Sequence, residues 1–486
     1  MTLSSSISAG INPHHNGRWL ALMVLCLGSL MIVLDTTIVN VALPSIRTDL
    51  GFSETSLAWV VNAYLLTFGG FLLLGGRLGD LYGYRKLFLV GIVLFTLASL
   101  SCGLAGTQWT LIVARALQGV GGAIVSAVSL SLTMNLFTEP ADRAKAMGVF
   151  GFVSAGGGSI GVLLGGLLTG TLNWHWIFLV NIPVGILVSI LSFFLIPKMQ
   201  DEASGHLDVA GAVTVTTSLM LAVYAIVNGN QNGWTSSLTL GLLAAAALLL
   251  ALFVWVESRV QSPMIPLKFF RLRNVVTANI VGVLWAASMF AWFFISALYL
   301  QLVLGYTPLQ VGLSFLPANL IMAAFSLGLS AKIVMKFGIR RPLAIGLFTA
   351  ACGLAWFARS PVAGNFTFDV LPGMILLGVG GGIAFNPMLL AAMSDVEPHE
   401  SGLASGIVNT AFMMGGALGL AILASLAASR TGSLVAAGSD HLVALNGGYH
   451  AAFLVGALFA VAAAIIGGAF LRISGVPVSP DMAHGV

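Results

Sequence analysis

Long apolar runs recur along the whole 486-residue chain, and few charged residues interrupt them. A helix of about 20 apolar residues spans the hydrocarbon core of a bilayer, where backbone groups must bond within the helix because water is absent. Only 7% of the residues are charged, whereas a soluble globular chain has about 25%. The sequence therefore predicts an all-α membrane protein and excludes soluble-enzyme, disordered and collagen-like classes.

Fourteen runs are predicted to span the membrane as helices. They lie near 18–43, 56–76, 87–106, 109–134, 145–171, 175–196, 208–228, 236–257, 274–300, 308–335, 342–358, 368–393, 402–427 and 450–471. Loops on the side of the two termini carry 16 of the 20 Lys and Arg residues, and the opposite loops carry only 3. Because cytoplasmic loops are enriched in Lys and Arg, both termini are expected to be cytoplasmic. The first run is too long for the apolar centre of a signal peptide and is expected to remain in the mature protein.

The chain also contains a repeat. Gly119-Val120-Gly121-Gly122 recurs 259 residues later as Gly378-Val379-Gly380-Gly381, and Gly338 follows Gly83 at a similar spacing. Chance similarity between glycine-rich helices is the alternative, but charged loop residues repeat along with the glycines. The repeat predicts six-helix bundles in residues 1–197 and 274–486, with two inserted helices and a cytoplasmic linker in 198–273. Two related halves around a midplane site are a common plan of secondary transporters.

Two ionisable residues, Asp35 and Arg115, lie deep within the predicted spans. A charge there costs at least ~2.5 kcal/mol on insertion scales, so both are candidate functional residues. Asp35 lies about 13 Å before Pro44 and Arg115 about 9 Å after Trp109, which places them at similar depth near the outer side.

The two residues have different candidate roles. A buried carboxyl group gains or loses its proton readily as a cation leaves or approaches, so Asp35 is a candidate proton carrier; the alternative is hydrogen bonding between helices. Arg115 either tunes Asp35 or bonds backbone carbonyls as structural support. A single buried carboxyl group predicts one proton exchanged per substrate.

Two glycine-rich motifs follow. The first is a short charged loop that predicts a cytoplasmic gate latch, or else an ordinary positively charged anchor; its residues are Gly76, Gly79, Asp80, Gly83, Arg85 and Lys86. The second lies in the fifth span, where small residues permit close helix packing or form a sliding contact between helices; it includes Gly157, Gly161, Gly165 and Gly166.

Aromatic and amide side chains in the spans predict a cavity for flat hydrophobic or cationic molecules. The alternative for each residue is lipid contact or packing. The candidates are Asn40, Asn62, Tyr64, Trp285, Trp292, Phe293, Asn319, Asn386 and Asn409.

Enzymatic and cofactor chemistry is not indicated. Paired catalytic groups, a phosphate-binding loop and a His, Asp or Glu metal cluster are lacking, and the three cysteines are too scattered for a metal site. Residues 258–273 are predicted to form an interfacial helix on anionic lipid. Residues 428–449 are predicted to be the longest outer loop, without an assigned function.

Four segments resemble a known family, the fourteen-helix drug:proton antiporters of the major facilitator superfamily, the EmrB/QacA group. Leu34 to Pro44 is similar to the signature of its first helix, and Gly76 to Lys86 resembles the superfamily's loop motif. Ala114 to Gly119 resembles the motif of the fourth helix, and Gly157 to Gly166 resembles the antiporter motif of the fifth. The resemblance covers essentially the whole chain.

This resemblance implies export of hydrophobic or amphipathic compounds, driven by the proton gradient without a bound cofactor. It implies protonation of Asp35 during the cycle, assistance by Arg115, and a gating network with Asp80 and Arg85. Two departures are Val162, where the family usually has proline, and Met335, where the second-half counterpart of Asp80 would align.

The expected setting is the bacterial inner membrane. Small-molecule substrate, protons and lipids are the expected partners, with a monomeric protein and no nucleic acid. The alternative function is uptake of a small polar solute by proton symport, which would predict more charged or amide groups in the cavity.

Overall fold

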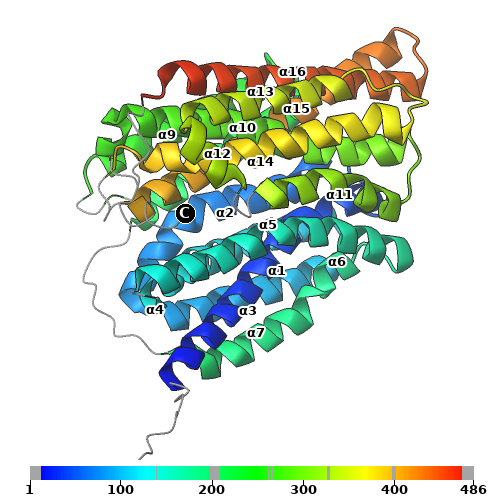
Figure 1. Cartoon of the computed structure of the whole chain (residues 1–486). Coiled ribbons are helices and arrows are strands. Elements are labelled where there is room, and N and C mark those ends of the chain that lie inside the picture. The colour runs from blue at the N-terminus through cyan, green and yellow to red at the C-terminus, as the bar shows by residue number, and fades with distance from the viewer. Residues whose placement is uncertain are drawn as a thin grey trace, which may run out of the picture.

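The computed structural model describes residues 13–137, 139–197, 208–260, 263, 267–325, 329–396 and 401–472. Over these residues every regular element is a helix, as the apolar runs predict (Figure 1). Eleven helical stretches among them are long and apolar enough to cross a membrane. The chain is therefore an all-helical integral membrane protein.

The helices fall into three groups along the chain. The first contains α1 (Pro13–Leu50), η1 (Ser56–Ala58), α2 (Trp59–Tyr82), α3 (Tyr84–Gly103), α4 (Gln108–Leu136), α5 (Pro140–Thr171), α6 (Trp176–Leu179) and α7 (Asn181–Leu195). The second contains α8 (Val209–Asn232) and α9 (Ser237–Glu257). The third contains η2 (Leu267–Arg271), α10 (Arg273–Leu298), η3 (Tyr299–Val303), α11 (Pro308–Ala324), α12 (Ser330–Phe337), α13 (Arg340–Phe357), η5 (Phe366–Val370), α14 (Leu371–Met393), α15 (Ser401–Ala436) and α16 (His441–Phe470).

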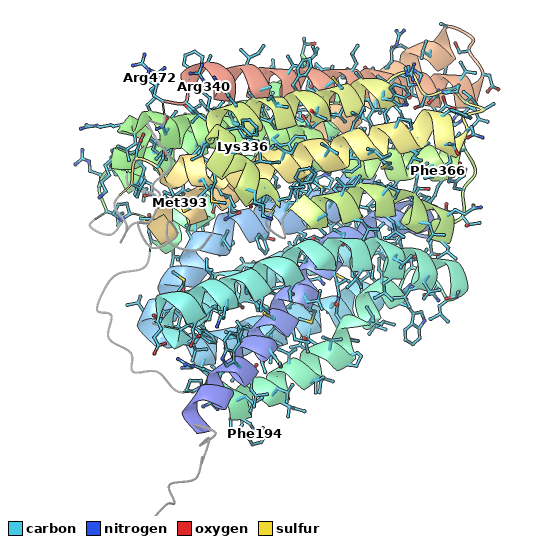
Figure 2. All side chains as sticks on the ribbon, in the orientation of Figure 1. Phe194, Lys336, Arg340, Phe366, Met393 and Arg472 are labelled. Atoms are coloured by element: carbon cyan, nitrogen blue, oxygen red, sulfur yellow. The ribbon has the colours of Figure 1, made fainter. Side chains whose placement is uncertain are left out.

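The first and third groups lie side by side, the first in the lower part of Figure 1 and the third in the upper part. α1 begins and α16 ends at the same end of the molecule, called the terminal side here. Figure 2 labels Arg472 and Met393 toward this end and Phe366 at the opposite end, called the far side. Near the far side, Gln301 Nε2 in η3 donates to the Val41 carbonyl of α1 at 2.8 Å and so joins the two groups.

Helix α8 of the second group contacts both the first and the third group. Asn230 Nδ2 donates to the Ser425 carbonyl of α15 at 2.8 Å. Gly70 of α2 packs on Thr216, because a Cβ atom at Gly70 would lie 3.0 Å from the Thr216 Cβ. The predicted linker 258–273 is described only in part, since residues 261–262 and 264–266 lie outside the described residues; η2 within it is a single short turn.

The predicted outer loop 428–449 is largely helical, so that prediction is wrong. α15 continues to Ala436, and α16 already begins at His441. Gly438 turns the chain with a φ of 86°, and the Asp440 carboxylate caps α16 by accepting a backbone N–H at 3.0 Å. Polar residues suggested a loop, but they also occur on helix ends and caps.

The sequence repeat reappears in the helix packing. Gly121 of α4 lets α3 come so close that a Cβ atom there would lie 2.7 Å from the Phe95 backbone nitrogen. Its counterpart Gly380 of α14 packs on α13 in the same way, with 2.5 Å to the Ala350 nitrogen. In both places any side chain would push against backbone, which cannot yield as a flexible side chain can.

We therefore expect Gly121→Ala to destabilise the protein by about 1–3 kcal/mol, the usual cost of overpacking a tight contact. Gly241→Ala on α9 is the matched control, because a Cβ atom at Gly241 would meet nothing within 4 Å. Thermal unfolding in detergent measures both. Equal midpoints for the two variants would show that the α3–α4 contact can relax.

Candidate functional site

Asp35 of α1 and Arg115 of α4 form a buried ion pair. The Arg115 Nη1 atom donates to Asp35 Oδ2 at 2.5 Å, and the residues are 0% and 1% exposed, respectively. The sequence predicts that the two side chains lie at similar depth, and in the structure they are in direct contact. Since each charge satisfies the other, the pair avoids leaving an isolated charge inside the membrane.

Neutral polar side chains complete the hydrogen bonding of this pair. Gln118 Nε2 and Asn181 Nδ2 donate to Asp35 Oδ1 at 2.7 and 3.3 Å. Both amides also donate to Ser99 Oγ, at 3.2 and 3.0 Å. We call these five residues the Asp35 network. It draws one side chain or more from each of α1, α3, α4 and α7, so the network joins four helices.

Aromatic rings and backbone enclose the Arg115 guanidinium. Its Cζ atom lies 4.4 Å from the Tyr64 ring centroid and 5.6 Å from that of Phe178. Its Nε donates to the Val60 carbonyl at 2.9 Å. Arg115 therefore makes both kinds of contact considered from the sequence, one to Asp35 and one to backbone, and its role in tuning Asp35 stays a prediction.

Helix spacing and glycines explain why these side chains meet. Arg115 and Gln118 are three residues apart and thus share one face of α4, where Arg115 Nη1 also donates to Gln118 Oε1 at 2.7 Å. Gly119, on the next position, lets α2 approach: a Cβ atom there would lie 2.5 Å from the Tyr64 carbonyl oxygen. The motif in α4 thus supplies both the polar groups and the close contact.

The glycines of α5 divide between two neighbours. Gly161 and Gly165 pack on α1 beside Asp35, since Cβ atoms there would lie 2.9 Å from the Leu34 and 2.6 Å from the Ile38 carbonyl oxygen. Gly157 packs on the same helix.

Gly166 instead faces α11 in the third group. A Cβ atom there would lie 2.6 Å from the Pro308 carbonyl oxygen, and one at Gly312 would lie 2.9 Å from that of Val162. These residues form what we call the α5–α11 seam, on the far side. The position without the usual proline, Val162, lies in this contact.

The loop motif makes its described contacts within its own group. Arg85 donates to the Phe193 carbonyl of α7 and lies 5.2 Å from that residue's ring centroid. Gly83 turns the chain with a φ of 88°, Gly79 packs on the Tyr84 ring, Gly76 is less tightly packed, and Lys86 is exposed. The Asp80 side chain lies outside the described residues, so the latch stays a prediction.

The cavity candidates occupy different places. Tyr64 covers Arg115, and Asn40 bonds the Thr36 carbonyl of its own helix at 3.2 Å. Asn386 and Asn409 are partly exposed on α14 and α15. The other candidates are buried: Asn62, Trp285, Trp292, Phe293 and Asn319.

Sequence reasoning missed several polar residues. Gln118, Asn181 and Ser99 are uncharged and so do not stand out in apolar runs, although Gln118 lies inside the recognised α4 motif. The expectation of a single buried carboxyl group is also wrong: Asp208 and Glu257, at the ends of α8 and α9, are 6% and 3% exposed. These two carboxyl groups escape a search for charges deep within the spans because they lie at span ends, where both pack beside Gly211.

We expect the ion pair to show strong thermodynamic coupling. Arg115→Gln leaves the Asp35 carboxylate without its charge partner and should destabilise the protein by about 3–5 kcal/mol. The same substitution in an Asp35→Asn background should cost much less, since no buried charge remains to be stranded. A double-mutant cycle on thermal unfolding measures the difference, and additive effects would contradict the pairing.

The sequence is similar to those of known proteins. The sequence profile of the Major Facilitator Superfamily matches residues 25–420. Puromycin resistance protein pur8 of Streptomyces alboniger is 40% identical over 95% of this chain and 92% of its own. Cephamycin export protein CmcT of Amycolatopsis lactamdurans is 37% identical over 92% and 91%.

Solved structures agree at the level of the fold. A bacterial homolog of the human lysosomal transporter Spinster has a TM-score of 0.68 at 16% identity, covering 94% of this chain and 97% of that one. A POT family peptide transporter has a TM-score of 0.65 at 17% identity, covering 95% and 99%. The chain therefore belongs to the Major Facilitator Superfamily and is a membrane transporter rather than an enzyme.

Proposed function

We propose that this transporter is a proton-coupled antiporter that exports hydrophobic or amphipathic small molecules by alternating access. The observation that carries the proposal is the Asp35–Arg115 pair, fully buried in a helical membrane protein. Ionisable residues at such positions are costly and mark proton or substrate pathways in transporters.

Protonation of Asp35 would change the bonding of the whole network. As a carboxylate, Asp35 accepts from Arg115, Gln118 and Asn181. A proton on Oδ2 removes the charge that Arg115 neutralises and occupies the atom to which its Nη1 donates. Arg115 must then find another acceptor or more solvent, so the protonated and ionised states favour different helix arrangements. A coupling ion has this effect on a two-state equilibrium.

The architecture supports rocking of two halves. We infer fourteen membrane-spanning helices, with bundles in residues 1–197 and 274–486, the insert and linker in 198–273, and both termini in the cytoplasm. The far side is then the outer side, where the α5–α11 seam and the Gln301–Val41 bond join the first and third groups of helices. Release of substrate to the outside requires these contacts to separate.

The direction and substrate class rest on the relatives. One is named for puromycin resistance, another for cephamycin export and a third, Stp of Mycobacterium tuberculosis, for multidrug resistance. Export of such small organic molecules suits a protein of the bacterial plasma membrane that works as a monomer and uses the proton gradient without a cofactor.

The test is dye transport into inverted vesicles with an imposed proton gradient. We expect gradient-driven accumulation with the wild type and at least a tenfold loss with Asp35→Asn, because the amide cannot carry the proton. Glu54→Gln is the matched control, since Glu54 pairs with Arg47 outside the network and should leave transport unchanged.

Two results would contradict the proposal. Full coupled transport by Asp35→Asn would remove Asp35 from proton coupling. Movement of dye out of inverted vesicles together with protons would indicate symport.

A further inference from the structure

Three buried N–H donors in the third group lack hydrogen-bond partners among the described residues. They are Nε1 of Trp285 and of Trp292 on α10 and Nδ2 of Asn319 on α11. The three residues are 1%, 1% and 6% exposed. Buried polar groups in proteins are nearly always bonded, and an unsatisfied one costs about 1–3 kcal/mol. Three such donors therefore point to a missing acceptor.

The donors come from facing surfaces of two helices. Trp285 and Trp292 are seven residues apart, so they share a face of α10 and stand about 10.5 Å apart along its axis. Asn319 lies between Phe315 and Met322, at spacings of four and three residues that place all three on one face of α11.

Side-chain contacts join these two faces. The Trp292 ring lies 5.7 Å from the Phe315 ring. A Cβ atom at Gly381 of α14 would lie 3.3 Å from Trp285 Cζ2 and 2.4 Å from Met322 Cε. Phe293 stacks on Phe315 with 5.4 Å between centroids. Trp292 thus lies beside Phe315, one turn before Asn319 on α11, and Trp285 lies near Met322, one turn after it. We call Trp285, Trp292 and Asn319, with the aromatic rings around them, the donor face.

The helices that form and border the donor face, α10, α11 and α14, carry few charges of their own. The sequences of α10, α11 and α14 contain one charged residue, Arg273, at the first position of α10. An organic cation buried between these helices would therefore have no carboxylate on them to compensate its desolvation. N–H groups present positive hydrogen atoms, so they match oxygen acceptors such as carbonyl, phosphoryl or ether groups.

We propose that the donor face is the substrate-recognition subsite and that it selects uncharged molecules bearing oxygen acceptors over organic cations. This inference rests on the proposed export function and narrows its substrate class. The stacked rings supply apolar contact area, and the N–H donors form hydrogen bonds to oxygen acceptors placed along the length of α10. Charge translocation is thereby left to the Asp35 network, in the other half of the chain.

The test compares two aryl-phosphorus probes of similar shape. Triphenylphosphine oxide is neutral with a strong acceptor, whereas methyltriphenylphosphonium is a cation with none, because a methyl group replaces the oxygen. Equilibrium dialysis against the purified full-length protein in nanodiscs, without a proton gradient, gives both affinities, and empty nanodiscs correct for partition into lipid. We expect the oxide to bind more tightly.

Single substitutions identify the donors. Trp285→Phe and Trp292→Phe keep an aromatic ring but lose the N–H, and each should weaken oxide binding roughly 2–10-fold, the range for one hydrogen bond. Neither should alter phosphonium binding, which a general disturbance of packing would also weaken. Trp255→Phe is the matched control, because Trp255 is exposed on α9 and should change neither affinity.

The outcomes separate this inference from the proposed function. Tighter phosphonium binding, or unchanged oxide binding in both tryptophan variants, overturns the donor face as the recognition subsite. Asp35→Asn should retain oxide binding. A protein that shows the expected probe selectivity but no proton-coupled transport would keep the inference and refute antiport.

Discussion

Burying a charge in the membrane is the constraint on which the first half of this molecule is built. Asp35 and Arg115 are tolerated because they pair at 2.5 Å and because Gln118, Asn181 and Ser99 complete their bonding. The stability of the pair depends on four helices keeping their places. The protonation of Asp35 that we propose would therefore change hydrogen bonds that join four helices and not those of one side chain alone.

Close helix contact is what makes this network possible. Gly119, Gly161 and Gly165 bring backbones to within the reach of short polar side chains. The second half repeats the glycine packing, with Gly380 standing for Gly121, but no charged residue lies inside α11 or α14. The same kind of glycine packing thus accompanies a buried ion pair in the first group and uncharged N–H donors in the third.

The sequence predicted the features that carry a large energetic signal. Apolar runs identified the helices, and the cost of intramembrane charge identified Asp35 and Arg115. It failed where the signal is small or ambiguous: uncharged Asn181 looks like any helix residue, and segment 428–449 is predicted as a loop although α15 and α16 occupy most of it. Which side chains bond to one another depends on how the helices are rotated and packed. The local residue pattern of a single sequence does not reveal this.

Helix α1 links the two interiors physically. It carries Asp35 and, six residues later, Val41, whose carbonyl accepts the Gln301 amide of η3 at 2.8 Å. η3 continues directly from α10, which bears Trp285 and Trp292. In the proposed cycle, a displacement of α1 on proton uptake would either break this bond or move the end of α10 with it. Either change would alter the far side, where the α5–α11 seam lies, so in the proposed cycle α1 would connect proton binding in the first group to opening of the far side.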